Sequence, residues 1–490
     1  MKISNKSIYI SVYVFLYINI FIFLFGFMKW YIALPVALGC MAGIWLSIEK
    51  IPAGSIEISR GMIITAVVSL ALMMIAAGHG GLCPQAPDWS ARNAILNDLI
   101  DKPWPVYYKN GSALVYYLGY FLLPSAIGKI AGFKAAYWVM YLYGVFGIFI
   151  VYLLLVKLLK ATDIRRQVII LLMLILFSNV EELKTIFTSI AEGVVKLFDS
   201  SYGRPFIMIG FTPFFELYFS VFNQIIPAFV VLALFLDSNK RLGSIAVAAV
   251  PLIIYSPFQL IFIFCLVVIA VVRQILSSSI KETAKQVFTL QNIAILVVLA
   301  PVLIMYLWGN LTEDKPDVLK FHRIEYGRNL YVYIVFVVVQ VVIYAIFLYR
   351  RYKRDPYFYA SVATLMILPL FQLGYWNDLC TRTSAAALFI FMVYTIELWF
   401  YDDMNIKANR VCAIALAVLV GISAAKPANE IVDKFRAGAG NFASQELQNN
   451  IHMPFDTFEG IEALNSADLQ YNFFAYNAKD QIFFKCLARE

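Results

Sequence analysis

The chain has 490 residues, of which 61% are hydrophobic and 14% are charged, with a formal net charge of +8. Soluble domains carry about 25% charged residues, so this composition excludes a water-soluble fold. The basic residues form short clusters between apolar runs, as in cytoplasmic loops, and do not indicate a nucleic-acid partner. Six cysteines without a CxxC pair and three separated histidines form no obvious metal site. We therefore expect an all-α, polytopic integral membrane protein embedded in a lipid bilayer.

Apolar runs recur along almost the whole chain. A helix needs about 20 apolar residues to cross the hydrocarbon core of a bilayer. The sequence therefore predicts thirteen transmembrane helices, give or take one or two, at 8–27, 31–48, 61–79, 135–157, 167–180, 224–237, 242–255, 257–275, 290–308, 331–349, 357–373, 383–400 and 410–425.

The basic residues of the short loops predict the orientation of the chain. With a cytoplasmic N-terminus, clusters such as 158–166 and 350–356 lie inside, while 80–134, 181–223 and 309–330 become long outer loops. The interpretation of segment 113–128 decides on which side of the membrane the later loops lie, because counting it as a span would move the cluster at 158–166 to the outside. The segment is apolar but short and aromatic, so we interpret it as a helix lying at the outer interface. The chain then divides into a transmembrane module, 1–425, and a small outer-face tail, 426–490.

The first outer loop carries Asp88, which follows Pro87 and precedes Trp89. A carboxylate near the bilayer surface can act as a general base on a hydroxyl group or bind a metal. Asp is also a favoured helix N-cap, and the sequence leaves both roles open. Residues 90–101 have an amphipathic pattern. They predict either an interfacial helix, with Arg92, Asn93 and Asp98 turned away from the membrane, or a plain connecting helix.

A second candidate cluster lies between two late apolar runs. Asp378 and Arg382 are four residues apart, so a helix places them on one face. Ionisable groups this close to the membrane are costly unless they are paired or face a polar cavity. We expect Arg382 to bind a phosphate that Asp378 helps to orient, with Asn377 beside them. The alternative is a self-contained ion pair that holds the helix end.

The remaining candidates lie in the other two outer loops. Arg323 and Arg328, with His322, suit a lipid phosphate because Arg presents a two-pronged donor to phosphate oxygens. Headgroup anchoring is the other interpretation of these residues. Arg204 lies in a predicted turn of the second outer loop, among acidic and aromatic residues that suit either sugar binding or an amphipathic surface helix.

An outer loop with an early Asp, amphipathic helices, a Tyr116-Tyr117-Leu118 segment ending in Pro and Gly, and a span leading to a basic inner loop resembles the GT-C superfamily of membrane glycosyltransferases. The resemblance covers roughly residues 61–180. It implies that Asp88 is the catalytic base or a metal ligand, and that the sugar donor is linked to a polyprenyl phosphate. In size and hydropathy the chain is similar to bacterial and phage-borne enzymes that add glucose from undecaprenyl-phosphate glucose to the O-antigen of lipopolysaccharide.

The chain departs from the superfamily pattern in two respects. Two extra spans precede the loop, and no paired acidic motif stands in it, so the need for a divalent metal stays open. We expect an inverting hexosyltransferase of the bacterial inner membrane, with its active site and C-terminus in the periplasm and a lipid-linked glycan as acceptor. Asp88 would deprotonate the acceptor, and Arg382 with Arg328 or Arg323 would stabilise the departing lipid phosphate. Asp378, Asn377, His322, Arg204 and Trp89 would complete substrate binding.

Other functions fit the same span count. A transporter or lipid-linked glycan flippase would place ionisable residues near the middle of its spans and would show symmetric halves. An O-antigen polymerase or ligase would share the membrane and the lipid-linked substrate. Three cysteines, Cys83, Cys380 and Cys486, fall on the predicted outer side, where a disulfide between two of them is open.

Overall fold

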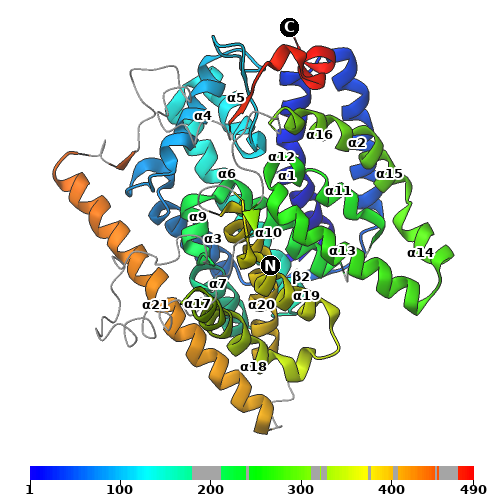
Figure 1. The fold of residues 1–490 in the computed structure, drawn as a ribbon. Helices are drawn as coiled ribbons and strands as arrows, with labels where there is room; N and C mark the ends of the chain where they lie inside the picture. Colours follow the sequence, from blue (N-terminus) through cyan, green and yellow to red (C-terminus); the bar gives the residue numbers. More distant parts are fainter. Residues whose placement is uncertain are drawn as a thin grey trace.

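The computed structural model of the chain is a bundle of α-helices (Figure 1). It describes residues 1–178, 211–238, 242–310, 320–321, 328–373, 377–400, 407–446, 450–451 and 473–489. The helices of the first part are α1 (Asn5–Phe27), α2 (Trp30–Glu49), α3 (Arg60–Ala76), α4 (Trp89–Asp101), α5 (Leu122–Ala131), α6 (Phe133–Leu158) and α7 (Ile164–Leu176).

The later helices include several short and broken ones. They are α9 (Phe214–Ser220), α10 (Phe222–Asp237), α11 (Ile245–Ala249), α12 (Leu252–Tyr255), α13 (Pro257–Ser277), α14 (Ile280–Val287), α15 (Leu290–Val298), α16 (Ala300–Trp308), α17 (Arg328–Val337), α18 (Ile343–Tyr352), α19 (Pro356–Ile367), α20 (Asp378–Phe400) and α21 (Lys407–Ala443). Single helical turns form η1 (His79–Gly81), η2 (Leu118–Tyr120), η3 (Leu242–Ser244), η5 (Leu368–Leu370) and η9 (Ala478–Asp480), and π-turns form η4 (Val338–Val342) and η10 (Phe483–Leu487).

Strands make three short antiparallel pairs. β1 (Lys2–Ser4) pairs with β2 (Ser55–Glu57), β3 (Ala113–Leu114) with β6 (Phe474–Ala475), and β4 (Lys320–Phe321) with β5 (Phe371–Gln372). The second pair ties the C-terminal tail to the loop that follows α4. The third ties the segment after α16 to the segment before α20.

Local chemistry explains where several helices begin and break. The hydroxyl of Ser59 accepts a hydrogen bond from the backbone N–H of Met62, which caps α3. The carboxylate of Asp163 caps α7 in the same way. Proline has no backbone N–H and interrupts a helical ladder, and Pro251 and Pro257 stand where α11, α12 and α13 meet.

Helix forms within each of the thirteen predicted apolar runs. Among the described residues, eight helices are long and apolar enough to cross a membrane: Asn5–Phe27, Trp30–Glu49, Phe133–Leu158, Pro257–Ser277, Leu290–Trp308, Tyr333–Tyr352, Asp378–Phe400 and Ala408–Ala443. This is the architecture of an all-α, polytopic membrane protein, while the count of thirteen crossings stays a prediction. The ten-residue α5 is about 15 Å long, too short for a hydrocarbon core of about 30 Å. Of segment 113–128 only residues 122–128 belong to this helix, because 113–114 form a strand and 118–120 form a 3-10 turn, so the structure gives a helix for part of the segment and its interfacial position stays a prediction.

The bundle has two ends that differ in composition. We call the end that holds the β1–β2 pair the N-terminal end, and there Asp237 at the end of α10 meets Tyr9 and Lys157. We call the opposite end, which carries residues 79–132 and 473–489, the loop end. Figure 1 shows the C-terminus at the loop end, beside α4, α5 and the tops of α1 and α2.

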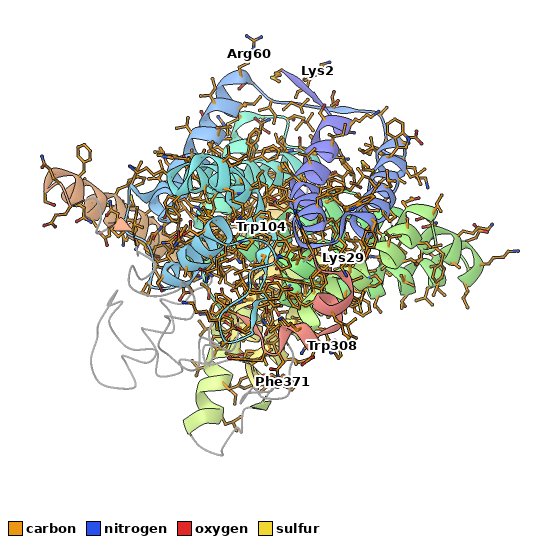
Figure 2. All side chains as sticks on the ribbon, turned by 90° about the horizontal axis from the view of Figure 1, so that it is seen from above. Lys2, Lys29, Arg60, Trp104, Trp308 and Phe371 are labelled. Atoms are coloured by element: carbon orange, nitrogen blue, oxygen red, sulfur yellow. The ribbon has the colours of Figure 1, made fainter. Side chains whose placement is uncertain are left out.

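The C-terminal tail is integrated into the loop end where the structure describes it. The backbone of Arg489 donates to the carbonyl of Phe27, and that of Lys29 donates to Leu487. Figure 2, which views the molecule from the loop end, places Lys29 and Trp104 near the centre and Lys2 and Arg60 together at the edge. The last residues therefore cap the first helical hairpin.

Close helix packing fixes the core beneath the loop end. A Cβ atom on Gly147 of α6 would lie 2.5 Å from Ile226 and 2.7 Å from Phe15, so only glycine allows α6 to approach both α1 and α10. The ring of Phe15 stacks on Tyr143 with a centroid distance of 4.4 Å. This packed core is the support on which the loop end rests.

Candidate active site

Trp89 anchors α4 to the bundle. Its indole Nε1 donates to the carbonyl of Phe219 at 2.7 Å, and its ring stacks on Phe222 with centroids 4.7 Å apart. The edge of the His79 ring completes this aromatic cluster. Trp89 is fully buried. The predicted contact of Trp89 with substrate is not tested, but its surroundings are protein groups and its observed task is to position the start of α4.

The polar residues of α4 also bond to the protein. Arg92 Nε donates to the carbonyl of Ser220 at 2.6 Å, and Asn93 Nδ2 donates to Gln85 Oε1 at 2.9 Å. Both side chains are buried. The prediction that Arg92 and Asn93 turn away from the membrane is compatible with their burial inside the protein, while the interfacial position of α4 stays a prediction. The two side chains are directed inward because the backbone carbonyl of Ser220 in α9 and the side-chain amide oxygen of Gln85 offer hydrogen-bond acceptors.

Asp98 is bound by two residues of its own loop. Its carboxylate accepts a hydrogen bond from the hydroxyl of Tyr108 at 2.7 Å and lies 3.7 Å from Lys102 Nζ. The Lys102 ammonium in turn lies 4.4 Å from the centroid of the Tyr108 ring. These three residues close the loop after α4, so Asp98 is a poor candidate for a catalytic base.

Asp88, which precedes α4, is exposed, unlike the buried polar residues of that helix. It occupies the N-cap position, but its side chain makes no capping hydrogen bond. The carboxylate lies 3.9 Å from Arg92 Nη2, and 58% of the side chain is exposed. A carboxylate that caps a helix accepts a bond from the second or third backbone N–H of that helix. The capping alternative is therefore not met, and the carboxylate points to open space.

Arg382 and Asp378 form the ion pair that the sequence predicts at the start of α20. Arg382 Nη2 lies 2.8 Å from Asp378 Oδ1, and the Arg382 side chain is 12% exposed. The guanidinium also lies over the ring of Phe258, 5.4 Å from its centroid. The Arg382 guanidinium thus contacts a carboxylate, Asp378, and an aromatic ring, Phe258.

Asn377 acts as the cap that starts α20. Its backbone has a φ of 51°, a left-handed conformation that Asn tolerates better than most residues. Its amide Nδ2 donates to the carbonyl of Phe371 at 2.9 Å, while its Oδ1 accepts from the N–H groups of Leu373 and Cys380. The side chain is fully buried. Its predicted contact with substrate stays untested, and its observed task is to turn the chain so that Asp378 and Arg382 emerge together.

The tertiary fold brings the two predicted clusters into one electrostatic neighbourhood. Arg382 interacts electrostatically with Asp378, with Tyr116 and Tyr117 and also with Asp88 of the first loop. Burial raises the pKa of Tyr117 above its usual range. Its phenol therefore stays protonated and can donate a hydrogen bond to an anion beside Arg382.

Sequence reasoning did not single out the aromatic residues around this cation. Tyr116 packs on Tyr117 and on Phe473 of the tail, and Tyr117 meets the edge of Phe258. The Tyr116-Tyr117 pair stood in the motif that carries the resemblance, which is the signal that could have found it. Phe258 and Phe473 have no such signal because they reach the site from distant parts of the chain.

Several predicted site residues cannot be placed. Arg204, His322 and Arg323 lie outside the described residues, and Arg328 begins α17 without a described side chain. Among the described residues, no group of three His, Cys, Asp or Glu side chains could hold a metal ion. No disulfide joins any of the six cysteines, Cys83, Cys380 and Cys486 included, and all six lie among the described residues.

The site therefore consists of an exposed carboxylate, Asp88, and an arginine, Arg382, that is paired with Asp378 and set among aromatic rings. Such a set can remove a proton from a hydroxyl group and neutralise a developing anion. Comparisons with protein-family models, with curated proteins and with solved structures find no match for this chain.

Proposed function

We propose that this protein is an inverting membrane glycosyltransferase of the GT-C type, which moves a hexose from a polyprenyl-phosphate donor to a lipid-linked glycan. One observation carries the proposal: the carboxylate of Asp88, at the start of α4, is exposed and makes no capping hydrogen bond, so it is available to act as a base. Undecaprenyl-phosphate glucose is the donor and O-antigen the acceptor that the sequence resemblance favours.

The reaction is a single displacement. Asp88 takes the proton of an acceptor hydroxyl while the acceptor oxygen attacks the anomeric carbon of the donor. The bond between that carbon and the lipid-phosphate oxygen breaks, and the phosphate leaves with the bonding electron pair. Arg382 neutralises the charge that develops on this phosphate, and the protonated phenol of Tyr117 can donate to it. Attack opposite the leaving group inverts the anomeric centre.

The fold supports the location of this chemistry. In the proposed topology the chain crosses a bacterial inner membrane thirteen times from a cytoplasmic N-terminus, so the loop end faces the periplasm. The tail then lies on the same side as the site, and Phe473 already packs on Tyr116 there. A polyprenyl-phosphate headgroup would reach Arg382 at the rim of the bundle from the surrounding lipid.

Asp88→Asn and Asp88→Ala test the proposal directly. Membranes containing the protein would be supplied with undecaprenyl-phosphate glucose and O-antigen acceptor, and glucose transfer would be measured. Loss of a general base typically costs between about 10² and 10⁴ in rate, and both variants should lose activity to that extent. Asp101→Asn is the matched control, because Asp101 is an exposed carboxylate at the other end of the same helix.

Two outcomes would oppose this assignment. Full activity in both Asp88 variants would remove Asp88 from the chemistry and turn the search to the acids of the second outer loop. An inactive unmodified chain would reject the donor and acceptor and favour the transporter or flippase. Reconstituted vesicles loaded with lipid-linked glycan would then be the system in which to measure translocation.

A further inference from the structure

We propose that a basic cavity at the N-terminal end of the bundle binds a phosphate-bearing anion, such as the headgroup of an anionic phospholipid. The cavity has a volume of about 860 Å³ and lies between the ends of α6, α7, α10, α13, α18, α19 and α20. Its lining residues on α20, Val393 to Phe400, lie at the opposite end of that helix from Arg382. This inference does not rest on the proposed glycosyl transfer.

The described residues that line the cavity carry more positive than negative charge. Four basic side chains face two acidic ones, Asp355 and Glu397, which gives a net charge of +2. The basic residues come from four separate segments of the chain and are Lys160, Arg166, Arg273 and Arg351. Focused positive charge in a cleft with low-dielectric walls attracts anions.

The two acidic side chains are bound to the cavity wall. The hydroxyl of Tyr352 donates to Glu397 Oε2 at 3.0 Å, and that of Tyr394 donates to Asp355 Oδ2 at 2.7 Å. The rings of these two tyrosines stack with centroids 4.0 Å apart. Hydrogen bonds from tyrosines therefore satisfy part of the acceptor capacity of both carboxylates, and less of it is directed at the arginines.

The arginines make long ion pairs with these carboxylates. Arg351 Nη2 lies 3.4 Å from Glu397 Oε1, and Arg273 Nη1 lies 3.8 Å from Asp355 Oδ1. Charge-assisted N–H···O bonds are usually about 2.7–2.9 Å long. The Arg273 side chain is also 53% exposed. A phosphate entering the cavity could meet the Arg273 guanidinium without first breaking a short ion pair.

The chemistry of the cavity fits an oxyanion such as a phosphate. Arginine offers planar, two-pronged recognition of phosphate oxygens, and several arginines around one cavity can share the charge of one group. The volume lies within the range of about 300–1,000 Å³ that is usual for small-ligand sites. Basic pockets between helices on the cytoplasmic side of membrane proteins bind lipid headgroups, and this end is the predicted cytoplasmic one.

The first experiment compares the unmodified protein with Arg273→Gln in detergent. Native mass spectrometry would count retained phosphatidylglycerol against phosphatidylcholine, and thermal shift would report binding of inorganic pyrophosphate. The expected result is preferential retention of phosphatidylglycerol that falls roughly tenfold in Arg273→Gln, the effect of about 1.4 kcal/mol of lost binding. Arg436→Gln is the matched control, because it removes an exposed arginine charge on α21, outside the cavity.

A second variant changes binding in the opposite direction. Glu397→Gln removes a negative charge of the cavity while it preserves the shape of the side chain, and it should strengthen binding of the same anion. Loss of phosphatidylglycerol preference in Arg273→Gln supports a lipid ligand. Binding of pyrophosphate that Arg273→Gln weakens, without any lipid preference, supports a soluble phosphate ligand. Equal binding by the unmodified protein and both variants, at unchanged melting temperatures, would overturn the proposal.

Discussion

The two ends of the bundle use their polar residues differently. At the loop end, buried polar side chains such as Arg92 and Asn377 bond to backbone or to each other, and only a few charged groups remain around Asp88 and Arg382. At the N-terminal end, charged side chains line two cavities of about 520 and 860 Å³. The comparison teaches that a segment rich in polar residues does not by itself form a polar cavity. The cavities form where charged side chains from several helix ends meet.

The largest expected effect concerns a buried ion pair at the N-terminal end. Lys157 Nζ lies 2.6 Å from Asp237 Oδ2, and the Asp237 side chain is 3% exposed. Lys157→Met removes the cation and leaves a buried carboxylate supported by Tyr9 alone. The expected loss of unfolding free energy is about 3–5 kcal/mol, measured by thermal and denaturant unfolding in detergent.

The double variant Lys157→Met with Asp237→Leu is the control for this effect. Replacing both partners of a buried pair by apolar groups is often close to neutral, so the double variant should recover most of the lost stability. A single variant as stable as the unmodified chain would show that the pair does not hold the ends of α6 and α10 together. The shape of the cavity that Lys157 and Asp237 line would then not depend on their ion pair.

The sequence predicted the helices well and the site only in part. Apolar runs mark the helices because a span must satisfy its own backbone hydrogen bonds in lipid. The Asp378–Arg382 pair was also predictable and is confirmed as an ion pair, since it needs only helical spacing. The task of Asn377 is local as well, but its left-handed backbone is set by β5 and α20 together and could not be read from the residue alone.

Contacts between distant segments set the remainder of the site. The proximity of Asp88 to Arg382 depends on how α4 docks on α9 and α10 through Trp89, which no spacing in the sequence encodes. The same reason explains the basic cavity at the other end. Arg166 and Arg351 lie in clusters that the sequence marked only as cytoplasmic, and Arg273 lies near the end of a predicted span. Their convergence results from packing of the helix ends.

An intermediate effect is expected at the loop end from Arg382→Lys. The substitution keeps the charge but loses the two-pronged geometry for phosphate. Hydrogen bonds to charged groups contribute about 1.5–3 kcal/mol, so we expect the KM for the polyprenyl-phosphate donor to rise between roughly tenfold and a hundredfold. The measurement is initial transfer rate against donor concentration at saturating acceptor.

A matched substitution separates phosphate binding from general charge loss. Arg436→Gln removes an exposed arginine charge that lies outside the proposed site, and it should leave the KM for donor unchanged. If Arg382→Lys changes only the melting temperature and not the KM, Arg382 is a structural partner of Asp378. The loop end would then hold its charges for stability alone.

The most gradual effect is a pH dependence of stability at the loop end. Burial lowers the pKa of His79 to about 3, whereas an unfolded histidine titrates near about 6.5. Its contribution to stability is present above about pH 6.5 and is lost as the pH falls toward about 3, because only the unfolded chain then takes up the proton. One such group changes the unfolding free energy by at most about 1.4 kcal/mol per pH unit. Thermal unfolding in detergent between pH 7.5 and 4.5 should show this slope in the unmodified chain and lose it in His79→Phe. An unchanged slope in His79→Phe would show that the imidazole packed between Trp89 and Phe222 is not the group that makes the loop end sensitive to acid.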